Sequence, residues 1–216
     1  MKFNPKDEKF YPTPRLVKLV RQYSRGKVLD VGCGTGEYFK FFKGSAIYGT
    51  DINTSYLKSI DKNKFQKKRI ILKKADIRKL PFKDREFDFI LSSLVLEYMK
   101  TPEELKKAIS ELKRVLKKNG LLIITTPHKN SFTTFVREYI ISQVLPKERI
   151  DPNFIMGVAR SQKDLKQHGF TTKGCLGWVT YRAINNEFLA QFLDLILWNI
   201  PFFSGTLIGI YKKSTS

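Results

Sequence analysis

The sequence predicts an α/β fold: a doubly wound, mostly parallel, seven-stranded sheet with helices on both faces, forming a three-layer sandwich. Three observations predict it. Apolar runs of strand length alternate with longer helical patterns, as in parallel strands joined by crossover helices. The chain has 216 residues, which suits one domain with a three-layer core. The first apolar run ends in a glycine-rich turn, VLDVGCGTGEYF, which is typical of a strand that leads into a helix.

The first half of the chain supplies four strands and the helices between them. A helix is expected over residues 14–23, and another begins near Gly36, after the glycine-rich turn. Asn53 or Thr54 can cap the helix that follows the second strand. The four strands are expected at 27–31, 46–50, 70–73 and 87–93.

The helix with the clearest sequence signals spans residues 101–120. Thr101 suits the N-cap and Pro102 the first turn. Glu104 is the capping-box partner of Thr101, and Gly120 follows the last turn. These signals predict both ends of the helix.

The pattern changes after a fifth strand at residues 121–127. The later part contains an apolar segment that we interpret as a helix near 186–199. The other expected elements are a helix at 132–144, a short capped helix at 161–170, and two strands at 171–181 and 206–212.

The chain is strongly basic. It has 40 Lys and Arg against 20 Asp and Glu, a formal net charge of +20 and a pI near 9.9. The basic residues are spread along the whole length rather than gathered in a tail. Such a surface attracts anions. It is either a solvated lysine-rich exterior or a surface for RNA, an anionic membrane or an anionic substrate.

Two cysteines, Cys33 and Cys175, are too few and too far apart for a disulfide framework or a metal-binding spacing. We therefore expect no metal site and a reducing cytoplasm. The first 15 residues match neither a signal peptide nor a transit helix. The apolar stretch 188–210 is interrupted by polar and helix-breaking residues before it reaches the length of a membrane span. The expected location is cytoplasmic, with peripheral attachment to a membrane as an alternative.

Gly32, Gly34 and Gly36 identify a binding turn. Backbone N–H groups converge at such a turn, and no side chain blocks a ligand. Position 37 is Glu, so the dinucleotide fingerprint G-x-G-x-x-G is not matched. No Gly-Lys-Ser or Gly-Lys-Thr follows, which argues against a phosphate-binding loop.

Two acids follow neighbouring strands of the predicted sheet. Asp51 ends the second strand, where a carboxylate can accept hydrogen bonds from both hydroxyls of a ribose. Asp76 follows the third strand, where it can accept from an exocyclic amino group such as that of adenine. The amide of Ile77 is then available to a ring nitrogen. Together these residues predict an adenosine-containing ligand.

In this order, the motifs resemble those of the class I S-adenosylmethionine-dependent methyltransferases, which have a Rossmann-like fold. The resemblance is to the broad type 11 branch, whose members often modify small molecules, quinones or lipids, and it covers about residues 25–130. It rests on Asp30, Gly32, Gly34, Gly36, Asp51, Asp76 and the strand FDFILSS at 87–93.

The resemblance implies a role for each of these positions, with S-adenosylmethionine as cofactor and S-adenosylhomocysteine as product. Gly32, Cys33 and Gly34 would lie against the methionine portion. Asp51, with Ile52 beside it, would hold the ribose. The adenine would meet Asp76 and Ile77. Asp30 would orient the turn and, through water, the amino group of the cofactor, while Ser92 would face its methionine end.

On this interpretation the single domain has three parts. Residues 1–25 form an N-terminal lid and helix, 26–127 the cofactor-binding core, and 128–216 a substrate-side insertion with the last strands. Tyr11 and Arg15 are candidates for the lid.

Methyl transfer needs alignment and exclusion of water rather than an obligatory catalytic triad. His128, directly after the fifth strand, is the candidate base or acceptor ligand, and Tyr11 is a second catalytic candidate. Glu97 and Tyr98 follow the fourth strand on the acceptor side. His168, before Gly169, is expected to cap a helix end.

The candidate acceptor is a small, apolar or lipid-like molecule, because bulky apolar residues surround most of the helix near 186–199. Ser92-Ser93-Leu94 does not match the motif of enzymes that methylate amide or adenine amino groups. No cysteine follows the fourth or fifth strand for covalent attack on a pyrimidine. An RNA- or protein-modifying methyltransferase and a non-catalytic cofactor-binding module remain as alternatives.

Overall fold

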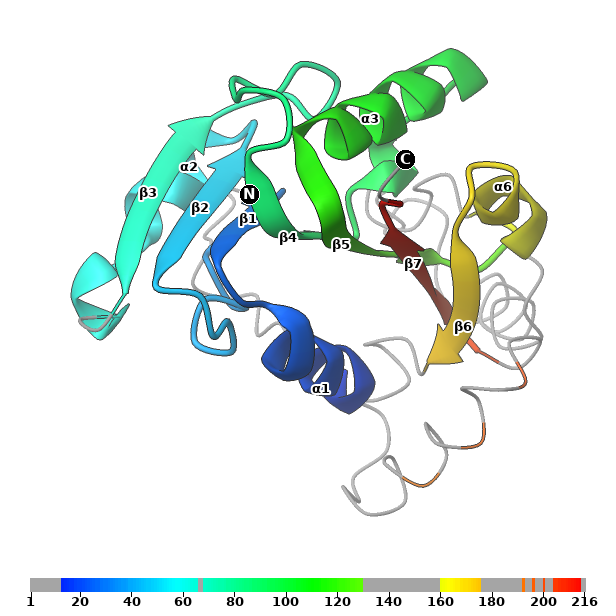
Figure 1. The fold of residues 1–216 in the computed structure, drawn as a ribbon, viewed down its shortest axis with the longest axis horizontal. Helices are drawn as coiled ribbons and strands as arrows, with labels where there is room; N and C mark the ends of the chain where they lie inside the picture. Colours follow the sequence, from blue (N-terminus) through cyan, green and yellow to red (C-terminus); the bar gives the residue numbers. More distant parts are fainter. Residues whose placement is uncertain are drawn as a thin grey trace, which may run out of the picture.

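The computed structural model describes residues 13–65, 68–129, 160–175, 192, 196, 200 and 204–214. Seven strands form one sheet in the order β3-β2-β1-β4-β5-β7-β6 (Figure 1). All neighbouring strands are parallel except β7, which is antiparallel to β5 and to β6. The predicted fold class is therefore confirmed. The strands are β1 Lys27–Val31, β2 Ala46–Asp51, β3 Arg69–Lys74, β4 Phe87–Ser93, β5 Leu116–Pro127, β6 Thr171–Cys175 and β7 Thr206–Lys212.

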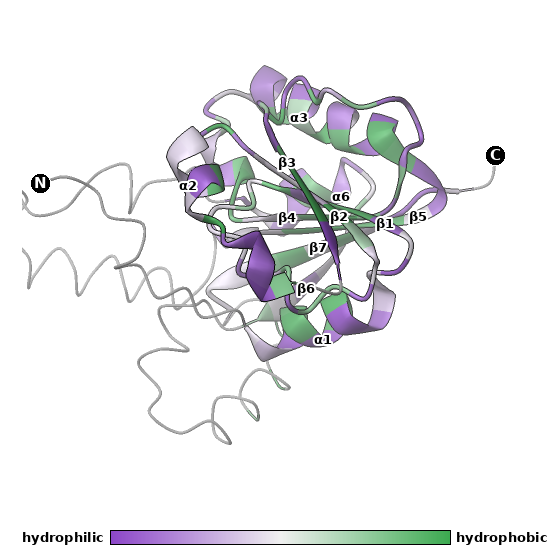
Figure 2. Cartoon of the chain, turned by 90° about the vertical axis from the view of Figure 1, so that its left-hand side faces the viewer, coloured by the Kyte–Doolittle hydropathy of each residue, from purple (hydrophilic) through white to green (hydrophobic). Residues whose placement is uncertain are grey.

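Helices cover both faces of the sheet. Figure 2 shows α3 on one side of the strands and α1 on the other. Leu16 and Val20 of α1 belong to one buried apolar cluster, and Leu105, Ile109 and Leu112 of α3 belong to a second. The helices and 3-10 turns are α1 Pro14–Tyr23, α2 Thr54–Ser59, η1 Lys62–Phe65, η2 Leu96–Tyr98, α3 Pro102–Val115 and α6 Gln162–Lys166.

The strand order reverses at β1, which lies between β2 and β4. The chain leaves β1 toward β2 on one side and later returns to β4 on the other. In open parallel sheets the crevice at such a reversal, outside the carboxyl ends of the strands, is where ligands bind. The glycine-rich turn follows β1 at this point.

The capping predictions hold where the structure describes them. Asn53 is the N-cap of α2, and its side-chain oxygen accepts from the amide of Ser55 at 2.9 Å. Thr101 caps α3 by accepting from the amide of Glu104 at 3.2 Å. The short helix α6 begins with a complete capping box between Ser161 and Asp164.

The predicted end of α3 near Gly120 was wrong, because the helix ends at Val115. Its last carbonyl groups are taken by other parts of the chain. Arg85 and Glu86 donate backbone N–H groups to Arg114 and Val115 at 2.9 and 2.8 Å. From Leu116 the chain continues as β5, whose first residue pairs with Phe87 of β4.

The helix predicted to begin near Gly36 was also wrong, because residues 34–41 form consecutive turns. The amides of Phe39 and Phe41 donate to carbonyls only three residues back, at 3.0 and 2.9 Å. The ammonium group of Lys68 binds the carbonyls of Phe39 and Phe42 at 2.8 and 2.7 Å, so these carbonyls have a tertiary partner.

Several predictions lie outside the described residues. These are the N-terminal lid with Tyr11, the helix at 132–144, residues 176–181, and most of the helix at 186–199. No helix in the described part of the chain is long and apolar enough to cross a membrane.

Candidate functional site

The glycine-rich turn folds against the end of β2. The amides of Gly32 and Cys33 both donate to the carbonyl oxygen of Thr50, at 2.7 and 2.9 Å. Gly32, Gly34 and Gly36 adopt φ angles of 71°, 51° and 79°, which residues with a Cβ disfavour. The path of the turn therefore depends on its three glycines.

Gly34 leaves the backbone open to a ligand. No heavy atom of the described residues lies within 4 Å of the position that a Cβ would take there. At Gly32, by contrast, a Cβ would lie 2.2 Å from Cγ2 of Val95, so that glycine is required for packing. The side chain of Cys33 is buried, and burial, with the charges of Asp30 and Asp51, raises the pKa of its thiol. A ligand would thus contact the main chain at Gly34. It would not meet a reactive thiolate at Cys33.

Asp51 is bound to the turn. One carboxylate oxygen accepts from the amide of Gly34 at 2.9 Å, and the other accepts from the amide of Asn53 at 2.8 Å. Each oxygen keeps a lone pair for a further donor, since a carboxylate has about four acceptor positions. Ile52, the next residue, is 61% exposed, so its apolar side chain is available to cover a bound group. This arrangement suits a ribose.

Asp30 is a buried acid without a partner. Its side chain is 1% exposed, and its Oδ2 atom makes no hydrogen bond in the described structure. Burial, reinforced by the charge of Asp51, raises the pKa of Asp30 to about 8. Buried carboxyl groups are normally hydrogen-bonded. The lone oxygen is therefore a position at which a cationic or N–H group of a ligand would be stabilised.

Ser92 lies on the other face of the sheet from Asp30. Asp30 is opposite Leu91 in the β1–β4 pairing, and the next residue, Ser92, is opposite Ile124 in the β4–β5 pairing. Because successive side chains alternate between faces, Asp30 points toward the α1 side and Ser92 toward the α3 side. The hydroxyl of Ser92 is buried and makes no hydrogen bond in the described structure. The two residues can therefore meet one ligand only from different sides of the strand ends.

Asp76 lies beside Asp51, since the amide of Ala75 donates to the carbonyl of Asp51 at 3.1 Å. Its carboxylate is held by Arg78, which donates from its backbone amide, its Nε and its Nη2. These contacts lower the pKa of Asp76. Ile77 packs its side chain into the core, and its amide donates to no acceptor in the described ranges. The carboxylate of Asp76 and the unused amide of Ile77 thus belong to consecutive residues at this edge of the sheet.

His128 is buried at the end of β5 and is 3% exposed. Its Nδ1 lies 3.3 Å from the carbonyl oxygen of Ser204, and its amide donates to Gly205 at 3.2 Å. The ring is therefore held against the start of β7. Tyr11, the other catalytic candidate, lies outside the described residues.

The sequence did not identify Arg160, which joins the chain after β5 to the turn after β4. Its backbone pairs with Pro127 and Lys129. Its Nη2 donates to the carbonyls of Leu96, at 3.0 Å, and of Met99. A single arginine just before the capped segment at 161–170 carries no sequence signal of such a role.

Glu97 lies between Leu96 and Met99 in the sequence. It is 8% exposed, and its Oε2 has no hydrogen-bond partner in the described structure. Burial raises the pKa of Glu97 to about 8, against the opposing effects of its backbone hydrogen bond and of Arg160. The sequence pointed to Glu97 only by its place after the fourth strand. The structure adds that it is a buried carboxyl group which keeps its proton near neutral pH.

The described residues contain no group of three His, Cys, Asp or Glu side chains that could hold a metal ion. The chemistry of the site is that of carboxylates, open main chain and apolar side chains. Together, the sheet order with its antiparallel β7, the open turn after β1, and the acid that ends β2 define the class: a class I S-adenosylmethionine-dependent methyltransferase domain.

Comparison with known proteins supports this class. Residues 29–124 match the family model of a methyltransferase domain. A solved S-adenosylmethionine-dependent methyltransferase from Archaeoglobus fulgidus shares the fold, with a TM-score of 0.59, 21% identity, and coverage of 93% of this chain and 92% of that one. The matched core thus supports a class I methyltransferase domain, a class whose cofactor is S-adenosylmethionine.

The curated relatives match over part of their length. An uncharacterized protein of Methanocaldococcus jannaschii is 42% identical over 53% of this chain and 51% of its own length. The ubiquinone/menaquinone biosynthesis C-methyltransferase of Campylobacter jejuni is 30% identical over 56% and 54%. A tRNA (carboxymethyluridine(34)-5-O)-methyltransferase of Arabidopsis thaliana is 33% identical over 54% and 28%. The chain therefore spans about half or less of the length of these relatives.

Proposed function

We propose that the protein transfers a methyl group from S-adenosylmethionine to a small, apolar or lipid-like acceptor. The observation that carries the cofactor part is the open main chain at Gly34, joined by a hydrogen bond to the carboxylate of Asp51. The unpaired Oδ2 of Asp30 lies at the end of the neighbouring strand. These groups fit a ligand that has a ribose and a cationic amino-acid arm.

The bound cofactor supplies a methyl group on a sulfonium that is already activated for displacement. The chain therefore has to hold, orient and shield the reacting groups. Asp51 accepts from the ribose and fixes the turn through Gly34. Asp30 accepts from the amino group, and Ile52 covers the bound nucleoside. Where the acceptor must lose a proton, the side chains available after β4 and β5 are Glu97 and His128.

The acceptor class is supported by exposed apolar side chains. Phe192 and Ile196 are both helical, lie four residues apart in the sequence, and are 51% and 41% exposed. Ile200, four residues further on, is 45% exposed. Apolar side chains that are exposed at this spacing in the sequence suit contact with an apolar molecule. The relative from Campylobacter jejuni, by its name, acts in quinone biosynthesis.

Calorimetry with S-adenosylhomocysteine tests the cofactor site. Replacing Asp51 by Ala removes an acceptor for the ribose and for Gly34, so affinity should weaken by about 1–3 kcal/mol. Asp61→Ala, at an exposed position outside the site, should leave the affinity unchanged. Unchanged affinity in Asp51→Ala would remove the assignment of this site.

A second assay identifies the acceptor. Methyl transfer from labelled cofactor into fractionated lipid, small-molecule and RNA extracts should label an apolar fraction. Label that appears only in RNA would replace the proposed acceptor class by the second candidate.

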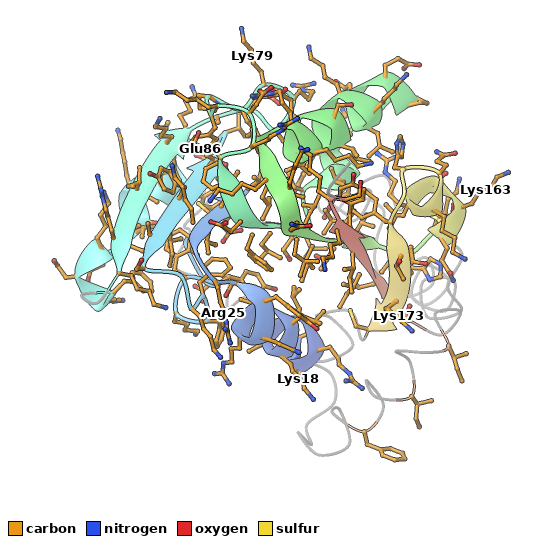
Figure 3. The ribbon with its side chains drawn as sticks, viewed as in Figure 1. Lys18, Arg25, Lys79, Glu86, Lys163 and Lys173 are labelled. Atoms are coloured by element: carbon orange, nitrogen blue, oxygen red, sulfur yellow. The ribbon has the colours of Figure 1, made fainter. Side chains whose placement is uncertain are left out.

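That second candidate is an RNA methyltransferase. Lys18, on α1, and Arg25, just after it, are exposed (Figure 3), and so is Arg21 of α1. The guanidinium of Arg21 and the ammonium of Lys40 lie 5.2 and 5.1 Å from the ring centre of Phe41. Basic groups beside an aromatic ring suit a nucleic acid. The relative from Arabidopsis thaliana is named as a tRNA methyltransferase. RNA affinity that falls steeply with salt, and falls further in Lys18→Glu/Arg21→Glu, would favour this candidate.

We also propose a cytoplasmic location. Cys33 and Cys175 are buried thiols rather than a disulfide, which suits a reducing compartment.

A further inference from the structure

We infer that Arg78 is a positioning residue that fixes the carboxylate of Asp76 for the exocyclic amino group of adenine, and so sets a preference for adenosyl over inosyl ligands. The inference rests on the proposed cofactor role of Asp76. It adds a residue that neither the motif nor the resemblance includes.

The hydrogen bonds around Asp76 leave room for one further donor. Oδ1 accepts from the backbone amide of Arg78 at 2.8 Å and from its Nε at 3.0 Å. Oδ2 accepts from Nη2 at 2.6 Å and, at 3.1 Å, shares the Nε. A carboxylate has about four acceptor positions. Three N–H groups of Arg78 make these four contacts, so the carboxylate has capacity for about one further donor, placed beside the guanidinium.

Arg78 is itself fixed from the other side. Its Nη1 donates to Glu104 in the first turn of α3. The second oxygen of Glu104 accepts from the amide of Lys100 at 2.8 Å, and the amide of Glu104 is bound by Thr101. The cap of α3 therefore holds Glu104, Glu104 holds Arg78, and Arg78 holds Asp76. A side-on pair that is anchored in this way is more rigid than an isolated surface ion pair.

This geometry has a chemical consequence for the base that is bound. The carboxylate of Asp76 can only accept, and the neighbouring amide of Ile77 can only donate. Adenine presents an N–H donor at its amino group and an acceptor at N1, which match both. Hypoxanthine, the base of inosine, presents a carbonyl oxygen and an N1–H, which match neither. A rigid Asp76 should therefore reject the inosyl ligand, and a loosened Asp76 should reject it less.

The chain offers a matched control. Arg114 also joins the loop after β3 to α3, through Glu111, Asp84 and the carbonyls of Leu80 and Phe82. Its side chain is 31% exposed, close to the 35% of Arg78. Arg114 does not contact Asp76. Replacing Arg114 therefore shows how much the ligand preference changes when an arginine that only anchors the loop is removed.

The test is calorimetric binding of S-adenosylhomocysteine and S-inosylhomocysteine to the wild type, Arg78→Met, Arg78→Lys, Asp76→Asn and Arg114→Met. Arg78→Met should reduce the adenosyl preference at least about tenfold, the size expected for one charge-assisted hydrogen bond. Arg78→Lys should restore little, because an ammonium cannot bind the carboxylate side-on. Arg114→Met should keep the wild-type preference.

The outcomes separate this inference from the proposed function. If Asp76→Asn loses the preference while Arg78→Met keeps it, Arg78 has no positioning role and the inference is overturned alone. If Arg78→Met and Arg114→Met lose the adenosyl preference to the same extent, the inference is also overturned, because general loosening of the loop after β3 would then explain the effect. If the wild type binds neither ligand, the proposed cofactor site and the inference fail together.

Discussion

At the scale of single residues, we expect Asp30 to couple cofactor binding to the release of a proton. Burial raises its pKa to about 8, so in the ligand-free protein this carboxyl is protonated at pH 7. A cationic amino group favours the charged form and lowers that pKa. Binding of S-adenosylhomocysteine at pH 7 should therefore release roughly one proton, and affinity should rise with pH up to about 8.

Calorimetry in two buffers of different ionisation enthalpy measures this proton. Asp30→Asn should bind more weakly and release none. If wild type and variant release the same number of protons, another group is responsible and Asp30 does not face the amino group.

Glu97 should make stability depend on pH. Its pKa is about 8 in the folded protein, against 4.5 in its ordinary state. Between these values the folded protein keeps a proton that the unfolded chain releases, so the free energy of unfolding falls as pH rises through this window. Glu97→Gln keeps the size of the side chain and cannot ionise. It should match the wild type near pH 5 and exceed it above pH 8, by on the order of a few kcal/mol.

Urea unfolding at several pH values checks this prediction. A stability difference between wild type and Glu97→Gln that stays constant from pH 5 to above pH 8 would show that Glu97 is ionised throughout, paired with Arg160.

At the scale of elements, local signals predicted where helices begin better than where they end. The caps Asn53 and Thr101 act within three residues, so the sequence shows them directly. The end of α3 depends on Arg85, Glu86 and Lys213, which bind its last carbonyls from distant parts of the chain. A pattern read along one segment contains no information about such partners.

Lys68 gives a prediction for the turns after the glycine loop. Its ammonium group binds the carbonyls of Phe39, Lys40 and Phe42 at 2.8, 3.3 and 2.7 Å. Lys68→Met leaves these carbonyls without that donor and should lower the free energy of unfolding by about 1–3 kcal/mol. It should also weaken S-adenosylhomocysteine binding, because these turns support the far side of the glycine loop.

The exposed Lys64 is the control, since Lys64→Met should change stability by no more than about 0.5 kcal/mol. Equal effects of the two substitutions in chemical unfolding would mean that Lys68 acts only through its charge.

At the scale of the whole molecule, the sequence could predict that the proposed cofactor-binding residues lie at one edge of the sheet, but not what surrounds the proposed acceptor-side residues. Asp30 and Asp51 lie at the carboxyl ends of β1 and β2, and Gly34 and Asp76 come just after β1 and β3. The topology brings such strand ends to one edge. Arg160 instead binds the carbonyl of Leu96, which is 64 residues away in sequence. Contacts of that kind depend on tertiary packing, and no spacing of residues in the sequence predicts them.

The net charge of +20 predicts how the whole fold responds to salt. Like charges repel in the compact state, and salt screens them, with a Debye length near 10 Å at about 0.1 M. The midpoint of thermal unfolding should therefore rise when sodium chloride is increased from about 0.02 to about 0.3 M. Chloride is preferable to sulfate because sulfate also strengthens apolar burial.

A variant with Lys18, Arg21 and Arg25 changed to Glu isolates the charge effect. All three side chains are exposed, and three reversals of two charges each lower the formal net charge from +20 to +14. This variant should unfold at a higher temperature than the wild type in low salt and should respond less to added salt. A wild-type midpoint that falls with salt would show instead that ion pairs such as Lys27–Glu86 and Arg114–Asp84 stabilise the fold more than repulsion destabilises it.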